Sequence, residues 1–203
     1  MPHDHHDHLS PSGHPYRADD DVPLTYWHAM EIAVRELLIE KGVTTPVAIN
    51  TQIDTMDARS PTNGAKVIAR YWTDPAFAKA LLADGAQATR DMGFDIGPMH
   101  LIALPNTDTL HNVVVCTLCS CYPRNLLGLP PDWYKSRAYR SRTVREPRKV
   151  LAEFGVTLPA NTQVRVHDST ADMRYIVIPD RPAGTDGWSP DQLAPLVTRD
   201  SMI

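Results

Sequence analysis

All three cysteines of this 203-residue chain lie within six consecutive residues, at Cys116, Cys119 and Cys121. An odd number of thiols in so short a segment cannot form a disulfide framework that joins distant parts of a chain. The segment follows the apolar, β-branched run 110–116, which is typical of a strand. For the three sulfurs to face one point, the backbone must wrap around that point, so the sequence predicts a metal-binding or reactive loop. We call residues 116–121 the claw.

The spacing of the thiols also allows main-chain nitrogens to bind a metal. The Cys119 sulfur and the amide nitrogen of Ser120 close one chelate ring, and the nitrogen and sulfur of Cys121 close another. Cys116 is then placed to act as an axial ligand, which leaves one position open. Amide nitrogens lose their protons only to a strongly polarising ion, which favours cobalt(III) or iron(III) over zinc.

Zinc, an iron–sulfur cluster and inert buried thiols are the alternatives at this segment. A structural zinc site uses four side-chain ligands, usually in two separated pairs, and the chain has no second cysteine pair. His111 or His167 would have to complete it. Iron–sulfur clusters also use four protein ligands, and a redox Cys-x-x-Cys motif has no need of a third thiol.

Composition narrows the class of protein. Hydrophobic residues at 42% and charged residues at 22% are ordinary values for a globular chain. A formal charge of -4 is the wrong sign for a dedicated nucleic-acid binder. No stretch approaches the roughly 18 apolar residues of a membrane span, and the first residues lack the apolar core of a signal peptide. We therefore expect a soluble cytoplasmic protein with no nucleic-acid or membrane partner.

The order of predicted elements indicates an α+β chain in three parts. Residues 1–20 are rich in His and Asp without apolar periodicity, which predicts a disordered tail. This tail either binds metal ions loosely through its histidines, or is a solvated segment or a remnant of expression. Residues 21–60 predict a helical arm. Residues 61–203 predict a metal-binding α/β body that mixes helices with strands.

The predicted arm holds two amphipathic helices. In the first, which ends at Gly42, an apolar stripe is formed by Trp27, Met30, Val34, Leu37 and Leu38. The second begins at Thr45 and Pro46. Two such helices have little room to bury their stripes on each other. The arm therefore packs on a partner chain or forms a helical hairpin on this chain's own core.

In the predicted body, helices are expected near 64–72, from Pro75, over 137–153 with a break or start near Pro147, and after Ser189. Strands are expected over 100–104, 110–116, 162–168 and 173–178.

Several motifs resemble the α subunit of nitrile hydratase, from about Glu31 to the last residue of the chain. They are VCTLCSC followed by YP, then LGLPPDWYKS, VREPRKVLAEFG, RPAGTDGW and LVTRDSMI. Thr117 resembles the cobalt-type claw, where iron-type members have serine. The resemblance implies a helical arm followed by a layered α-β-β-α body, and a β-subunit partner supplied as one chain or as two split chains. It also implies non-corrin cobalt(III), with iron(III) as the alternative, delivered by an activator protein.

The resemblance further implies the roles of the claw residues. Cys116 remains a thiolate, Cys119 becomes a sulfinate and Cys121 a sulfenate, while Ser120 and Cys121 provide amide nitrogens. Cys119, Ser120 and Cys121 are the catalytic candidates for hydrating a nitrile to its amide. Two routes stay open: the metal polarises the nitrile or lowers the pKa of a bound water, or the Cys121 sulfenate oxygen is the nucleophile.

The implied centre carries a formal charge near -2, which is costly to bury without cations. In the family, two arginines of the β subunit supply them. Local candidates in this chain, which are otherwise surface charges, are Arg124, Arg140, Arg142 and Arg145. Aromatic residues that either wall the pocket or belong to the core are Trp133, Tyr134 and Tyr139.

Two features depart from the nitrile hydratase pattern. Arg124 and Asn125 stand where nitrile hydratases commonly carry Trp-Pro, and an arginine there resembles the γ subunit of thiocyanate hydrolase. The family's glutamine before the claw has no counterpart in DIGPMHLIAL. The alternative functions are therefore that γ subunit, or a non-enzymatic subunit that carries cobalt to another complex.

Overall fold

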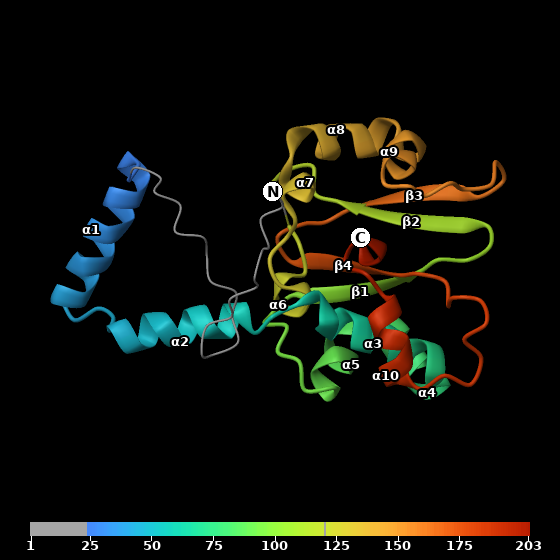
Figure 1. The fold of residues 1–203 in the computed structure, drawn as a ribbon, viewed down its shortest axis with the longest axis horizontal. Coiled ribbons are helices and arrows are strands. Elements are labelled where there is room, and N and C mark those ends of the chain that lie inside the picture. The colour runs from blue at the N-terminus through green and yellow to red at the C-terminus, as the bar shows by residue number, and fades with distance from the viewer. Residues whose placement is uncertain (1–23, 120) are drawn as a thin grey trace, which may run out of the picture. The chain divides into compact units, whose positions relative to one another are not determined.

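The computed structural model describes residues 24–119 and 121–203 (Figure 1). The chain divides into two compact units between Thr51 and Gln52. The predicted tail over 1–20 and the predicted ligand Ser120 lie outside the described residues. No helix among the described residues is long and apolar enough to cross a membrane.

Both predicted helices of the arm are present, as α1 (Tyr26–Glu40) and α2 (Pro46–Asp57). The hydroxyl of Thr25 caps α1 by accepting a hydrogen bond from the amide of His28. Gly42 follows the end of α1 at φ 67°, a left-handed conformation that glycine adopts without strain. Neither helix contains a buried residue, and Trp27 is 75% exposed. The side chains of the apolar stripe that these helices carry are therefore not buried among the described residues.

The described residues of the second unit form four strands, close to the four predicted ones: β1 (His100–Pro105), β2 (Leu110–Val115), β3 (Gln163–Asp168) and β4 (Met173–Ile178). They form two parallel pairs, β1 with β4 and β2 with β3. In the second pair Val115 lies opposite Asp168. Because paired parallel strands end at the same edge, the claw starts directly beside Asp168.

The helices of the second unit include three that the sequence pattern does not predict, α5, α6 and α7. All the α-helices described after α2 are α3 (Pro61–Thr73), α4 (Pro75–Ala83), α5 (Gly85–Asp91), α6 (Arg124–Leu127), α7 (Asp132–Lys135), α8 (Arg137–Arg145), α9 (Pro147–Glu153) and α10 (Pro190–Leu193). The predicted interruption near Pro147 is confirmed, since α8 and α9 are separated by Glu146. The chain is thus α+β.

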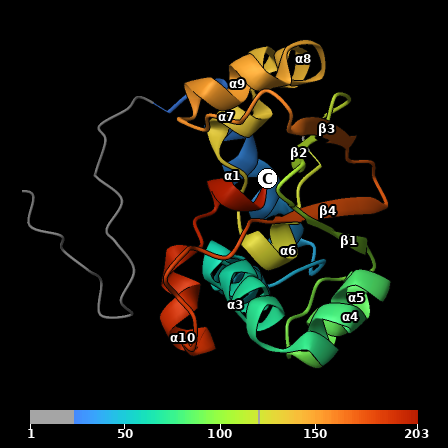
Figure 2. The same ribbon diagram turned by 90° about the vertical axis from the view of Figure 1, so that its right-hand side faces the viewer.

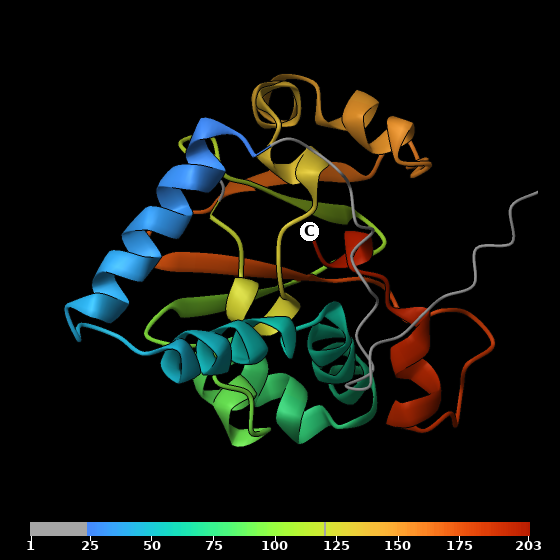
Figure 3. The ribbon, with the colours of Figure 1, turned by 60° about the vertical axis from the view of Figure 1, so that its left-hand side comes forward.

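Figures 1 and 2 show the strands of the second unit between two groups of helices, with α8 and α9 on one side and α3, α4 and α5 on the other. The hydrophobic core fills the space between them, with Ile68, Leu81, Val114 and Ile176 almost fully buried. Figure 3 turns toward the viewer the edge at which α6 and α7, in yellow, follow the claw. This edge carries the site described next.

The contact of α3 with α6 depends on Gly64. A Cβ at this position would lie 2.2 Å from Cδ2 of Leu127, so a larger residue would have to displace this buried side chain. The glycine therefore lets α3 support the short helix that follows the claw.

Candidate metal centre

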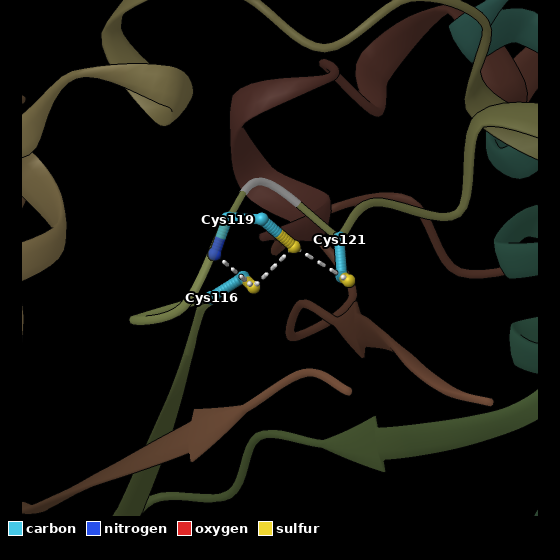
Figure 4. A group of neighbouring side chains, drawn as sticks. All are labelled: Cys116, Cys119 and Cys121. Carbon is cyan, nitrogen blue, oxygen red and sulfur yellow. Dashed lines mark hydrogen bonds between the residues drawn. The ribbon is translucent and has the colours of Figure 1, made fainter. Parts of the chain in front are cut away.

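The three thiols converge at the end of β2, as predicted (Figure 4). The Sγ atoms of Cys116 and Cys119 are 3.6 Å apart, those of Cys119 and Cys121 are 3.2 Å apart, and all three lie within 4.8 Å of one another. These separations exceed the roughly 2.05 Å of a disulfide bond. The amide of Cys119 donates to the Cys116 sulfur at 3.3 Å, so the backbone wraps around the sulfurs.

The sulfur separations fit a single bound metal ion. With metal–sulfur bonds of about 2.3 Å, thiolates at right angles lie about 3.3 Å apart and tetrahedral ones about 3.8 Å apart. In the described part of the chain, the cluster of side chains able to hold a metal consists of Cys116, Cys119 and Cys121. His111 instead contacts Asn106, and His167 contacts Asn112. Among the described residues, a zinc site would therefore lack its fourth side-chain ligand.

The thiols differ in their surroundings. Cys116 is fully buried, Cys119 is exposed and Cys121 is half-buried. Burial, followed by hydrogen bonds with the two other thiols, raises the pKa of Cys121 to about 12, although the charge of Arg174 acts in the opposite direction. At neutral pH this thiol keeps its proton until a metal displaces it.

Asp168 fixes the first half of the claw. Its carboxylate accepts hydrogen bonds from the amide of Thr117 at 2.9 Å and from the Thr117 hydroxyl at 2.5 Å. This contact follows from the parallel pairing of β2 with β3. The sequence pattern places Asp168 at the end of a strand, but only the register brings it to the claw.

The second half of the claw is held from two sides. The hydroxyl of Tyr134 donates to the carbonyl of Cys121 at 2.7 Å, and Nε of Arg174 donates to the carbonyl of Tyr122 at 3.2 Å. Tyr134 is buried, which raises its pKa above the usual range and keeps the hydroxyl protonated as a donor. This residue supports the claw backbone, and Arg174 is a site residue that sequence analysis did not identify.

The four candidate arginines have different surroundings. Arg142 forms ion pairs with Glu146 at 2.7 Å and Glu153 at 2.5 Å, and these hydrogen bonds raise its pKa. Arg124 begins α6 with an exposed side chain, and Arg145 donates to a carbonyl of its own helix.

Of the four, Arg140 is the one with a described hydrogen bond to the claw, from Nη1 to the carbonyl of Thr117 at 3.4 Å. A hollow of about 510 Å³ lies beside this contact, lined by Thr117 and three arginines, Arg137, Arg140 and Arg145, together with Ser141 and Val144. The lining itself contains no acidic residue, so the hollow is cationic, although the exposed carboxylate of Asp168 contacts Thr117 beside it.

The claw and the fold around it agree with a known family. Residues 25–203 match the family model described as nitrile hydratase, alpha chain. This chain belongs to that family. The family resemblance predicted from the motifs is therefore confirmed, and the chain is assigned to a class of hydro-lyase enzymes.

Similar proteins include both nitrile hydratases and a thiocyanate hydrolase. The chain is 50% identical over 176 residues to the cobalt-containing nitrile hydratase subunit alpha of Pseudonocardia thermophila, covering 84% of this chain and 85% of the relative. It is 46% identical over 186 residues to thiocyanate hydrolase subunit gamma of Thiobacillus thioparus, covering 86% and 76%.

Solved structures of both kinds of enzyme are also similar to this chain. A recombinant thiocyanate hydrolase with partially modified cobalt centres superposes with a TM-score of 0.83 at 45% identity, covering 88% of each chain. A double mutant of the Fe-type nitrile hydratase from Comamonas testosteroni Ni1 superposes with a TM-score of 0.82 at 43% identity, covering 87% of each chain.

Proposed function

We propose that this chain is the α subunit of a cobalt-type nitrile hydratase, which adds water across a nitrile: R–C≡N + H2O gives R–C(=O)–NH2. The oxygen of water goes to the nitrile carbon, and both hydrogens end on nitrogen. The observation that carries the proposal is the convergence of three thiols within 4.8 Å on a segment containing Thr117. The relatives named as cobalt-containing nitrile hydratases support the same reading.

Cys116, Cys119 and Cys121 would hold cobalt(III) through sulfur, and Ser120 and Cys121 would hold it through main-chain nitrogen. When bound, the ion supplies Lewis-acid polarisation at the open position. We propose Cys119, Ser120 and Cys121 as the catalytic residues.

The exposure of the thiols supports different oxidation states. Cys119 and Cys121 are more accessible than the fully buried Cys116. An oxidant such as dioxygen can therefore convert Cys119 to the sulfinate and Cys121 to the sulfenate while Cys116 remains a thiolate. The Cys121 sulfenate oxygen is then one candidate nucleophile, and water is the other.

The residues around the claw keep this loop in place. Asp168 holds the Thr117 end, and Tyr134 and Arg174 hold the Cys121 end through main-chain carbonyls. Fixing both ends before the substrate arrives reduces the reorganisation needed during the reaction.

We further propose a heteromer with a β-type subunit, as one chain or two. The uncovered stripe of α1 supports a partner for the arm, and the negative charge of the loaded claw calls for cations beyond Arg140. Residues 21–60 would be the contact arm, and residues 61–203 the layered α-β-β-α body. An activator protein would deliver cobalt in the cytoplasm.

The test is hydration of a neutral nitrile by the chain co-expressed with the neighbouring β-type gene product and supplied with cobalt. We expect amide formation that is lost in Cys121→Ser and kept in a control such as Asp172→Ala, an exposed acid outside the claw. Cobalt bound without amide formation in the assembled complex would favour a transfer subunit instead.

The γ subunit of a thiocyanate hydrolase is the second candidate function. Two observations favour it: the cationic hollow beside Thr117, and Arg124 at the start of α6. Positive charge near the claw attracts an anion such as thiocyanate more than it attracts a neutral nitrile. Comparing specificity constants for the two substrates in the assembled enzyme separates the candidates.

A further inference from the structure

A cavity of about 250 Å³ lies in the second unit, apart from the claw. None of the three cysteines lines it. Its aromatic wall is formed by Trp133, Tyr139 and Phe154, with ring centroids of Trp133 at 4.8 Å from Tyr139 and 4.7 Å from Phe154. The hydroxyl of Tyr139 donates to the carbonyl of Val114 at 2.7 Å, which fixes this ring. Of the aromatic residues predicted either to wall the pocket at the claw or to belong to the core, Tyr134 and Tyr139 are core residues. Trp133 and Tyr139 line this separate cavity.

Six polar residues line the same cavity: Asn106, His111, Asn112, Thr198, Asp200 and Ser201. The hydrogen bonds of the first three define what His111 offers a ligand. Oδ1 of Asn106 accepts from the amide of Asn112 at 2.8 Å, so the other atom of this side-chain amide is the nitrogen. That nitrogen, Nδ2, donates to Nδ1 of His111 at 3.3 Å. The neutral His111 ring therefore carries its proton on Nε2. This N–H has no hydrogen-bond partner among the described residues.

The charges around the cavity disfavour anions, and the donor on His111 selects for a molecule that carries an acceptor. Burial lowers the pKa of His111, so the ring is neutral at physiological pH, although the charge of Asp180 opposes this effect. Asp200 lines the cavity and disfavours anions, although its ion pair with Arg199 at 3.4 Å offsets part of this charge. An N–H donor needs an acceptor, which a simple cation lacks. The remaining class is an uncharged molecule with a hydrogen-bond acceptor.

We propose that this cavity binds an uncharged organic molecule that combines a ring with one carbonyl group. The carbonyl oxygen accepts a hydrogen bond from Nε2 of His111, and the ring packs against Trp133, Tyr139 and Phe154. Phe154 is 44% exposed, so one part of the wall is reachable from solvent. The site requires neither cobalt nor any claw residue, so it stands independently of the proposed hydration activity.

The test uses two probes that differ in the carbonyl, acetophenone and ethylbenzene, titrated against the full chain by calorimetry and by NMR of ring-labelled histidine. Neither probe is a nitrile or an amide. Acetophenone is expected to bind one-to-one and to shift the His111 ring resonances. Loss of one neutral hydrogen bond corresponds to roughly a 5- to 10-fold weaker affinity for ethylbenzene.

Variants test whether acetophenone binds in this cavity and not elsewhere on the protein. His111→Phe should weaken acetophenone binding by about the same 5- to 10-fold, because it removes the donor and keeps a ring. His100→Phe is the matched control, since His100 is exposed and does not line the cavity, and it should bind normally. Val156→Trp, which fills the cavity, should abolish binding. Absence of saturable acetophenone binding, equal affinity for the two probes, or unchanged binding in Val156→Trp would overturn the proposal.

Discussion

Asp168 provides the sharpest test of how the fold holds the claw. Each charge-assisted hydrogen bond to a shielded carboxylate contributes about 1.5–3 kcal/mol. Because Asp168 and Thr117 are both exposed, we expect Asp168→Ala to cost only about 1–2 kcal/mol in total. For a chain of this size, that corresponds to a fall in Tm of about 2–8 °C.

The same variant should affect the metal more than the fold. Residues that support a ligand-bearing segment typically change metal affinity or activity by about 10–100-fold. We expect Asp168→Ala to lower cobalt affinity and specific activity by this amount. Asp168→Asn, which keeps one acceptor oxygen, should lose less, and Asp172→Ala should leave both quantities unchanged.

Calorimetry and cobalt titration on single and double variants complete the test. Thr117→Val removes the hydroxyl donor while the amide donor remains. If the two residues act through their contact, the double variant Thr117→Val with Asp168→Ala should lose about 1 kcal/mol less stability than the sum of the singles. Strictly additive losses, with normal cobalt affinity in Asp168→Ala, would refute this reasoning.

Three further predictions concern pH, substrate and assembly. In the folded protein the pKa of Cys121 is raised to about 12 from an ordinary value of 9.0, so the thiol of the unfolded chain loses its proton first. The metal-free protein should therefore lose stability as the pH rises above 9, which measurements of Tm would show. A constant Tm from pH 9 to 11 would contradict this prediction. Arg124→Trp should raise the ratio of specificity constants for a neutral nitrile over thiocyanate, and an unchanged ratio would mean that this arginine has no selective role. Light scattering at micromolar concentration should detect a heteromer with the co-expressed β-type chain, whereas a fully active monomer would exclude it.

The elements with strong local signals could be predicted from the sequence. The four strands are short β-branched runs between turn residues, and Pro75, Pro147 and Pro190 mark helix starts because proline suits the first turn. α5 (Gly85–Asp91) was not predicted, since its sequence GAQATRD has no apolar periodicity. α6 and α7 have four residues each, too few for any period to be visible.

The residues of the site also differ in how well the sequence predicts them. The convergence of the thiols follows from their spacing, because all three belong to one short loop. Asp168 reaches the claw through the pairing of β3 with β2, and Arg174 reaches it from β4, which pairs with β1. No local pattern encodes that pairing, since loop-closure entropy and packing of the whole body decide it.

The composition of the loaded claw tests the central claim most directly. Elemental analysis of the active complex should find about one cobalt per chain, and mass spectrometry of the peptide containing Cys116 to Cys121 should find about three added oxygen atoms, or about 48 Da. Two of these oxygens should map to Cys119 and one to Cys121. Active protein that contains zinc and three unmodified thiols would contradict the proposed centre.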